Sequence, residues 1–324
     1  MLDQNLKRST VDEVYTQIIA DLTIAEAGLP DKTPQGGRAT LWAAKSVLAD
    51  VYFFQGKYAE VCNKAKEVIA SGKFSLVEAA VANDFDKLYG PDISTTTEEV
   101  FHLKYTKQSS TGNGYPFLYL HPNAKLFGGT CFYVCYSKSD NPFIQAWDAN
   151  DLRKTYNFIS IGDFGLGATA ILNKKFFDPK ATASNGSSND YPMYRYADVL
   201  LLYAEAASRA AGGPTADALD ALNQVRRRAY GKNTKTPSSV DFKLSDYTAS
   251  TFADLVIQER GYETMFEGKR WFDLKRLGKD KFRAIIKGVK GKDVADKNFL
   301  WPIPTLELNY NLALDPTKDQ NPGY

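Results

Sequence analysis

Two pairs of amphipathic helices constrain the fold of this chain more than any other feature. The first pair lies within residues 39–69 and the second within residues 196–229, and in each the apolar residues recur every three or four positions. Glycines interrupt the pattern at Gly56 and Gly212, where one helix of a pair would turn into the next. A hairpin of two such helices buries both of its faces only by stacking on neighbours. We therefore predict a mainly α fold of tetratricopeptide-like helical hairpins.

A single helix precedes the first hairpin, and a longer one follows the second. Thr10 and Glu13 have the spacing of a capping box, which predicts a helix that begins directly after Thr10. Apolar spacing predicts one continuous helix from about Thr251 to Leu277. The tail from Phe299 onward contains four prolines, so we expect it to be extended.

The sequence between the hairpins is irregular. Residues 75–190 carry short apolar runs among many Gly, Pro, Ser and Asn residues, a pattern that predicts a large loop-rich insertion with few short strands. Within a single domain of residues 1–324, we expect a helical hairpin region at 1–77 and a loop-rich ligand-binding region at 78–190. The C-terminal helices and the extended tail then occupy residues 191–324.

Charge, histidine and cysteine content exclude several classes of function. Forty Lys and Arg residues against 38 Asp and Glu residues leave a formal charge of +2, which is too balanced for a nucleic-acid-binding protein. The two histidines, His102 and His121, are too far apart for a helical zinc motif. Cys62, Cys131 and Cys135 lack a further Cys or His pair that would close a zinc site, so we interpret them as free thiols. We expect no metal and no cofactor.

Three glutamates recur every four residues on the predicted long helix. Glu259, Glu263 and Glu267 would share one helical face, and this spacing could support metal binding or acid–base catalysis. Basic residues such as Arg260 are interleaved with them and no histidine accompanies them, which favours structural ion pairs. The catalytic alternative is a helical glycosidase that uses Glu259 or Glu263, and it predicts hydrolysis that Glu263→Gln abolishes.

Aromatic side chains concentrate in the loop-rich region. Residues 101–160 hold thirteen of the 42 aromatic residues, and Lys107 and Lys125 are the only charged residues from Thr106 to Ser137. Flat rings stack on the apolar faces of sugars, while amide and hydroxyl groups supply neutral hydrogen bonds. The predicted ligand-binding residues are Asn113, Tyr115, Tyr119, Tyr133 and Tyr136. We assign four other rings of this stretch to the core: Phe101, Phe117, Phe143 and Phe158.

Several segments resemble one protein family along essentially the whole chain. The string IQERGYETMFEGKRWFDLKRLG at 257–278 and the ending QNPGY are the most specific of them. They are similar to the corresponding segments of the SusD/RagB nutrient-binding proteins of the Bacteroidetes outer membrane. Further similar segments lie, in the family's order, at 8–30, 37–76, 191–210, 222–229 and 299–324.

The resemblance implies a surface lipoprotein of the outer membrane that has no enzymatic activity. Such a protein captures a glycan or oligosaccharide and delivers it to a SusC-like TonB-dependent transporter. In the family, variable loops supply most ligand contacts. The resemblance also assigns a set of charged residues to holding the fold together: Glu259, Arg260, Glu263, Glu267, Arg270 and Asp273.

The beginning of the chain departs from the family pattern. Family members begin with a signal peptide, a lipid-attached cysteine and further helices, whereas the first twenty residues here have no apolar signal region. We expect a truncated or short form, whose membrane association would need a lipid anchor that this chain does not contain. Apolar helix faces near residues 11–55 should then be exposed and seek a partner.

Two functions from different classes remain open at this point. The leading hypothesis is a non-catalytic glycan-binding protein whose site is built from the loops at 105–136. The alternative is a helical scaffold that binds a peptide or protein partner and has no affinity for sugar. Replacement of Tyr133 and Tyr136 by Ala should abolish sugar binding under the first hypothesis and leave partner binding intact under the second.

Overall fold

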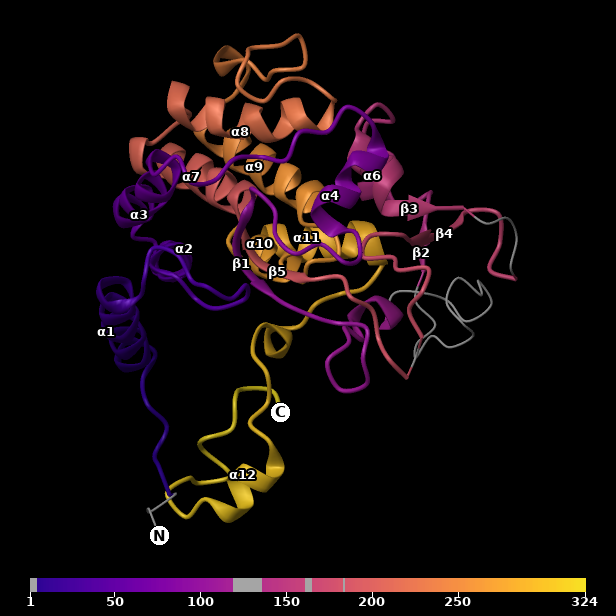
Figure 1. Cartoon of the computed structure of the whole chain (residues 1–324). Coiled ribbons are helices and arrows are strands. Elements are labelled where there is room, and N and C mark those ends of the chain that lie inside the picture. The colour runs from indigo at the N-terminus through magenta and orange to yellow at the C-terminus, as the bar shows by residue number, and fades with distance from the viewer. Residues whose placement is uncertain (1–4, 119–135, 161–164, 183) are drawn as a thin grey trace. The chain divides into compact units, whose positions relative to one another are not determined.

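The computed structural model describes residues 5–118, 136–160, 165–182 and 184–324. Its internal contacts separate two compact units (Figure 1). The larger unit comprises Leu22–Leu277, and the smaller one comprises Met1–Asp21 together with Gly278–Tyr324.

Helical hairpins form the scaffold of the larger unit. Its longer helices are α2 (Leu41–Phe54), α3 (Tyr58–Ala70), α7 (Tyr196–Ala211), α8 (Ala216–Ala229) and α9 (Ala249–Glu263). Helix α7 is the central element, because it packs against α3, α8 and α9 (Figure 1). Leu200, Leu201 and Ala204 of α7 are completely buried in the main hydrophobic cluster. The two predicted hairpins, α2 with α3 and α7 with α8, are therefore confirmed.

Local signals in the sequence explain where these helices start and stop. The hydroxyl of Thr40 accepts the backbone amide of Ala43 at the start of α2, and that of Thr215 accepts the amide of Ala218 at the start of α8. Gly212 ends α7 in a left-handed conformation with φ of 71°, which glycine adopts without steric cost. The starts of α2 and α8 and the end of α7 thus follow from residues next to each helix end.

The predicted continuous helix at 251–277 is wrong. Helix α9 ends at Glu263, and a separate short helix, α10, spans Arg270–Lys275. Phe266 and Gly268 between them have φ of 63° and 73°, and an α-helix does not continue through such left-handed residues. As a result, Glu267 lies in a tight turn rather than on the helix.

Short elements in the 75–190 region support the larger unit. Strand β1 (Glu99–Leu103) pairs antiparallel with β5 (Tyr191–Arg195), and β2 (Ser137–Lys138) and β3 (Phe158–Ile159) flank β4 (Ala170–Asn173). The short helices of this region are α4 (Asp86–Tyr89), α5 (Pro142–Gln145) and α6 (Leu152–Asn157). The region consists mostly of connections, and the expected few short strands are present.

The smaller unit joins the two ends of the chain. It contains α11 (Lys279–Lys290), α12 (Thr305–Tyr310) and the start of α1 (Val11–Gly28), which continues into the larger unit. The capping box at the start of α1 is confirmed, since the amide of Thr10 donates to Glu13 at 2.8 Å and the amide of Glu13 donates to the Thr10 hydroxyl at 3.2 Å.

The C-terminal tail is held by its side-chain amides. Gln320 exchanges two hydrogen bonds with the backbone of Ile303, at 2.9 and 3.0 Å. Asn321 donates to the carbonyl of Trp301 at 2.6 Å and accepts from Arg8 at 2.7 Å. The prediction of an extended tail is wrong for α12, because Pro304 precedes the first turn of that helix, where a missing amide proton has no cost.

Candidate functional site

The three regularly spaced glutamates belong to a buried charge cluster in the larger unit. Glu263 forms ion pairs with Arg153 at 3.0 Å and with Arg195 at 2.8 Å, and it also pairs with Arg228. Glu267 pairs with Arg195 at 2.8 Å, after the turn beyond α9 has redirected the chain. We use the name buried charge cluster for Glu98, Arg153, Lys175, Arg195, Arg228, Glu259, Glu263 and Glu267. Every member is buried.

The electrostatics of this cluster favour the structural interpretation of the glutamates. Burial would raise the pKa of Glu263, but Arg228, Arg195 and Arg153 together hold it well below its usual value. Burial raises the pKa of Glu259, against the opposing effect of Arg153. The Glu263 side chain has no exposed surface and its oxygens are held by three guanidinium groups, so a substrate has no route to it. The predicted ion pairs are confirmed, although they are buried rather than exposed.

The predicted ligand-binding residues fall into three situations. Asn113 is 2% exposed and uses its side chain internally, donating to the carbonyl of Asn189 at 2.9 Å and accepting the amide of Tyr115 at 2.9 Å. Tyr136 is 40% exposed. Tyr119 and Tyr133 lie outside the described residues. As ligand contacts, all five residues stay predictions.

Other predictions about single side chains have mixed outcomes. Phe117 is buried as expected, whereas Phe101, Phe143 and Phe158 are only partly buried. Cys62 is a free thiol, and the other two cysteines lie outside the described residues.

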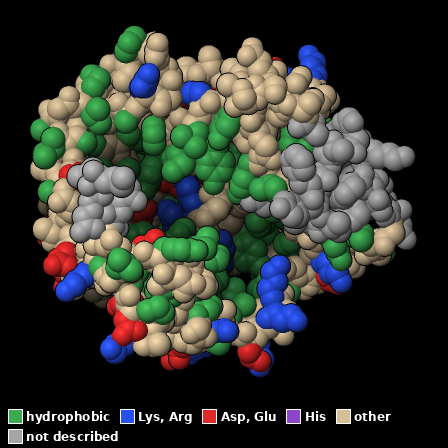
Figure 2. Space-filling view, turned by 90° about the horizontal axis from the view of Figure 1, so that it is seen from below, with side chains coloured by type: hydrophobic (Ala, Val, Ile, Leu, Met, Phe, Trp, Pro, Cys, Tyr) green, Lys and Arg blue, Asp and Glu red, His purple; other side chains and the backbone are tan. Residues whose placement is uncertain are grey.

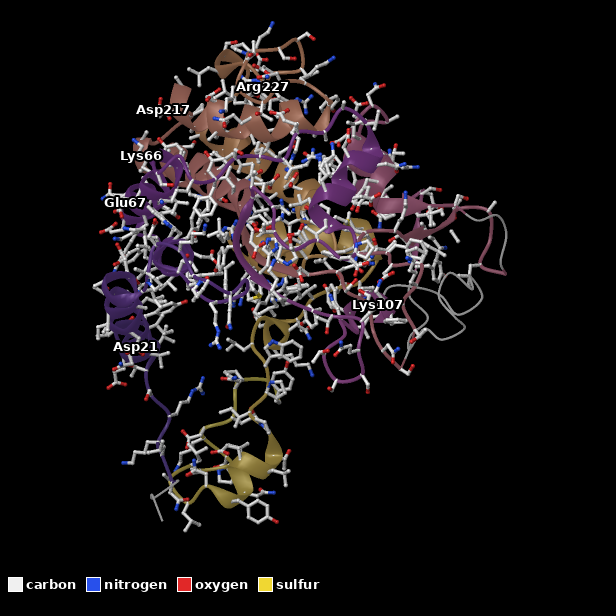
Figure 3. All side chains as sticks on the ribbon, viewed as in Figure 1. Asp21, Lys66, Glu67, Lys107, Asp217 and Arg227 are labelled. Carbon is white, nitrogen blue, oxygen red and sulfur yellow. The ribbon has the colours of Figure 1, made fainter. Side chains whose placement is uncertain are left out.

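Lys107 shows how the aromatic stretch accommodates a charge. Its ammonium group, on the residue labelled in Figure 3, lies 3.1 Å from Asp178 and 3.2 Å from Asp92, so two carboxylates neutralise this lysine.

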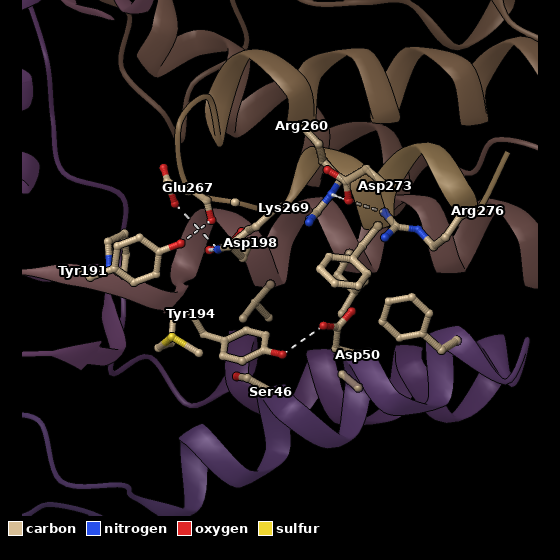
Figure 4. Close-up of a pocket in the computed structure, with 18 residues that line it drawn as sticks. Ser46, Asp50, Tyr191, Tyr194, Asp198, Arg260, Glu267, Lys269, Asp273 and Arg276 are labelled. Atoms are coloured by element: carbon tan, nitrogen blue, oxygen red, sulfur yellow. Dashed lines mark hydrogen bonds and ion pairs between the residues drawn. The ribbon is translucent and has the colours of Figure 1, made fainter. Parts of the chain in front are cut away.

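A cavity of about 300 Å³ lies between α2, β5 and the α9–α10 turn (Figure 4). We name it the Arg260 cavity. Ser46 and Asp50 line it from α2, Tyr191 and Tyr194 from β5, and Arg260 and Phe272 from the other side. The sequence analysis did not identify this site, because its walls come from three segments that are distant in the chain.

Polar groups of the Arg260 cavity are only partly hydrogen-bonded. The hydroxyl of Tyr194 donates to Asp50 at 2.9 Å, and Nε of Arg260 donates to Asp273 at 2.9 Å (Figure 4). Nη1 of Arg260 is buried and has no hydrogen-bond partner, and the same holds for Oδ2 of Asp273. Buried polar atoms without a partner are uncommon in folded proteins and call for an explanation.

Two tyrosines connect the cavity with the predicted ligand loops. The ring of Tyr115 packs edge to face on that of Tyr191, with centroids 5.0 Å apart. Their hydroxyls donate to the carbonyls of Phe266 and Glu267 at 3.0 and 2.8 Å, so both rings are fixed to the turn after α9. A Cβ atom at Gly268 would lie 3.0 Å from the Tyr191 hydroxyl, so glycine allows this close approach.

Apolar side chains of the cavity lining are exposed to solvent. Phe272 is 51% exposed and packs edge to face on Phe54, with ring centroids 6.0 Å apart, and Met193 is also exposed. On the face drawn in Figure 2, hydrophobic side chains gather in adjoining patches, and most Lys, Arg, Asp and Glu side chains lie toward the rim of the view. Exposed rings beside a cavity are typical of ligand sites.

A second, more open groove of about 550 Å³ lies beside Trp42. The indole NH of Trp42 donates to Asp31 at 2.6 Å, and the Lys73 ammonium lies over the ring, 6.0 Å from its centroid. Phe74 packs against the same ring with centroids 6.3 Å apart. The NH group and the ring of Trp42 therefore already have partners, whereas Nε2 of His102, which also lines this groove, is buried and has none among the described residues.

Two family models match this chain, one in its C-terminal half and one near its N-terminus. Residues 162–324 match a family model described as the SusD family, and residues 2–53 match one described as starch-binding and associating with the outer membrane. Within the part of the chain that the structure describes, no helix has the length and apolar character needed to cross a membrane.

Curated relatives are similar over nearly all of this chain. SusD-like protein P2 of Formosa agariphila is 28% identical over 98% of the chain, and SusD-like protein P25 of the same organism is 23% identical over 98%. In both cases the chain spans 66% of the relative's own length.

Solved structures share the fold. A SusD superfamily protein from Parabacteroides distasonis superposes with a TM-score of 0.80 at 26% identity, covering 100% of this chain and 72% of the other. Surface glycan-binding protein A from Bacteroides thetaiotaomicron, in complex with laminarihexaose, gives a TM-score of 0.75 at 21% identity and covers 97% and 72%. The predicted mainly α, tetratricopeptide-like fold is confirmed.

Proposed function

The chain belongs to the SusD family, and from this premise we propose that it binds a glycan or oligosaccharide without cleaving it. One observation carries the proposal: the fold matches, over 97% of this chain, a glycan-binding protein whose structure holds laminarihexaose. The buried charge cluster supports the absence of catalysis, because its carboxylates are committed to guanidinium groups inside the protein.

We place the binding site in the loops at 105–136, within one family domain of residues 1–324. Tyr136 is exposed and can offer a ring to a sugar, while Asn113 and Tyr115 hold the loop base against the scaffold. Tyr119 and Tyr133 complete the proposed set. Recognition by these loops then depends on stacking and neutral hydrogen bonds rather than on charge.

We further propose that the protein acts at the cell surface, on the outer membrane, and passes its ligand to a SusC-like TonB-dependent transporter. The family description of outer-membrane association for residues 2–53 supports the location. A lipid anchor would attach the protein to the membrane.

Affinity electrophoresis against plant, host and microbial polysaccharides tests the proposed function. At least one polysaccharide should retard the wild-type protein, and the Tyr133→Ala, Tyr136→Ala double variant should lose that retardation because the stacking faces are gone. Tyr310→Ala is the matched control, since Tyr310 is an exposed ring on α12 of the smaller unit. Unchanged retardation of the double variant would refute the loop site, and no retardation of the wild type would refute glycan binding.

The peptide-binding or protein-binding scaffold remains the second candidate because α1 is unusually exposed. None of its residues is buried, and Ile24 is 72% exposed. Val11 on the same helix and Phe54 on α2 are exposed as well, as the sequence analysis expects for this region. If the scaffold function is correct, the tyrosine double variant binds its protein partner as well as the wild type does.

A further inference from the structure

One of the carboxylates that line the Arg260 cavity has no ion pair among the described residues. Asp198 pairs with Lys269 at 2.7 Å, and Asp273 pairs with Arg260 at 2.9 Å and with Arg276 at 2.8 Å. Among the described residues, Asp50 forms no ion pair, and it accepts a hydrogen bond from the hydroxyl of Tyr194. The cavity therefore has one carboxylate without a cation on its α2 wall.

Arg260 faces this carboxylate from the opposite wall. Its side chain is buried, 5% exposed, and extends from α9 toward the space above Asp50 and Tyr194 (Figure 4). Burial opposes its charge, but Asp273, Asp198 and Asp50 raise its pKa, so the guanidinium stays protonated. Since Nη1 has no hydrogen-bond partner, an acceptor from a ligand would remove the cost of leaving this donor unpaired.

The two walls together select the chemistry of a ligand. A group between them must accept a hydrogen bond from Arg260 and donate one to Asp50, and a hydroxyl group does both. Asp50 would repel a carboxylate or a phosphate, and Arg260 would repel an ammonium group. The walls also carry the rings of Tyr191, Tyr194 and Phe272, which suit the apolar face of a sugar.

Cavity size indicates how much of a glycan can enter. Ligand cavities run from about 300 to about 1,000 Å³. At about 300 Å³, the Arg260 cavity is at the small end of this range and suits a single ring better than a length of chain.

We propose that the Arg260 cavity binds the terminal sugar ring of a glycan, with Asp50 and Arg260 holding its hydroxyl groups. This proposal rests on the proposed function and extends it, because the packed rings of Tyr115 and Tyr191 join the cavity to the base of the 105–136 loops. The end of the glycan enters the cavity, and its following sugar rings extend toward Tyr115 at the base of the loops.

Asp50→Asn is the decisive variant. It keeps an acceptor for the Tyr194 hydroxyl and the shape of the side chain, but it removes the charge that holds a ligand hydroxyl. Asp217→Asn is the matched control, because Asp217 is an exposed carboxylate in the first turn of α8 (Figure 3).

Calorimetry should compare short oligosaccharides with their parent polysaccharide, chosen by the electrophoresis above. We expect Asp50→Asn to weaken oligosaccharide binding about tenfold or more and Asp217→Asn to leave it unchanged. Retardation by the polysaccharide, which has few chain ends, should survive in Asp50→Asn. Equal oligosaccharide affinities of the wild type and Asp50→Asn would overturn the proposal, as would an equal loss for oligosaccharide and polysaccharide.

A second measurement separates failure of this subsite from failure of glycan binding as a whole. Saturation-transfer NMR with D-glucose, D-galactose, D-mannose and D-xylose examines the cavity directly, whatever the polysaccharide screen gives. Signals with the wild type that disappear in Asp50→Asn support a sugar subsite, even if no polysaccharide binds. A glutamine-containing dipeptide serves as the probe for peptide binding in the same experiment. Absence of any sugar signal overturns the proposal, and so does a signal obtained only with this dipeptide.

Discussion

The buried charge cluster and the Arg260 cavity differ in how their charged side chains are paired. Glu263 in the cluster is surrounded by three guanidinium groups and has no exposed surface. Arg260, one helical turn earlier on α9, lines a cavity and has one buried nitrogen without a hydrogen-bond partner. The difference lies in the ion pairs, because every member of the cluster has an oppositely charged partner, although Nε of Arg228 has no hydrogen-bond partner, whereas Asp50 in the cavity has no ion pair among the described residues. Paired charges hold segments of the fold together, and the carboxylate without an ion pair can hold a ligand.

The ion pairs of the cluster connect elements that are far apart in the sequence. Arg153 lies on α6, Arg195 at the end of β5 and Arg228 on α8, so Glu263 links three separate elements to α9. Burying such charges is costly, and removal of one partner leaves the others without compensation. The cluster should therefore be sensitive to any single substitution.

Glu263→Gln is the strongest test of this difference. Three buried guanidinium groups would lose a shared carboxylate, and we expect the free energy of unfolding to fall by about 3–5 kcal/mol. Urea denaturation measures the loss, with Glu60→Gln on the exposed surface of α3 as the matched control. If the two variants are equally stable, the cluster does not stabilise the fold. If the wild type hydrolyses a glycan and Glu263→Gln does not, the glycosidase alternative is supported instead.

Gly268→Ala tests the turn that separates the two regions. The φ of 73° and the 3.0 Å approach of a Cβ atom to the Tyr191 hydroxyl predict a loss of about 1–2 kcal/mol. Gly213→Ala should be neutral in the same denaturation experiment, because nothing lies within 4 Å of a Cβ atom built there. Equal stabilities of the two variants would show that the turn tolerates a side chain.

His102 provides a pH-dependent test at the boundary between the two regions. Burial, with Lys104, Arg195 and Lys269 nearby and Glu267 opposing them, lowers its pKa from 6.5 to about 3. The unfolded chain therefore takes up a proton first, and the stability that is present above pH 6.5 is lost as the pH falls toward 3.

Between about pH 7 and pH 5.5, we expect a loss of about 1 kcal/mol in the free energy of unfolding. His102→Gln should show a flatter dependence on pH in this window, whatever its absolute stability. The same slope in both proteins would mean that His102 does not titrate as this account requires.

Local sequence signals were sufficient for the helical hairpins but not for the site. Apolar spacing and turn glycines determine α2, α3, α7 and α8 because each depends on neighbouring residues. The break after Glu263 has a weaker signal, Gly268, and the left-handed Phe266 beside it is stabilised by tertiary packing against Phe158. Charge spacing alone indicated that the glutamates form ion pairs, but not which partners they have.

The Arg260 cavity could not be predicted from the sequence for a related reason. Asp50, Tyr194 and Arg260 are separated by long stretches of chain, and only the packing of α2, β5 and α9 brings them together. The predicted ligand loops have a compositional signal in their rings, but Tyr119 and Tyr133 lie outside the described residues.

The most direct test of the central claim is to measure the unfolding free energy and the oligosaccharide affinity of Asp50→Asn in the same buffer. If incompletely paired charges serve mainly binding, the free energy of unfolding falls by no more than about 1 kcal/mol, because Asp273 and Asp198 still stabilise Arg260 and the Tyr194 hydroxyl keeps an acceptor. Affinity then falls about tenfold or more. A variant that loses stability and keeps its affinity would contradict the claim.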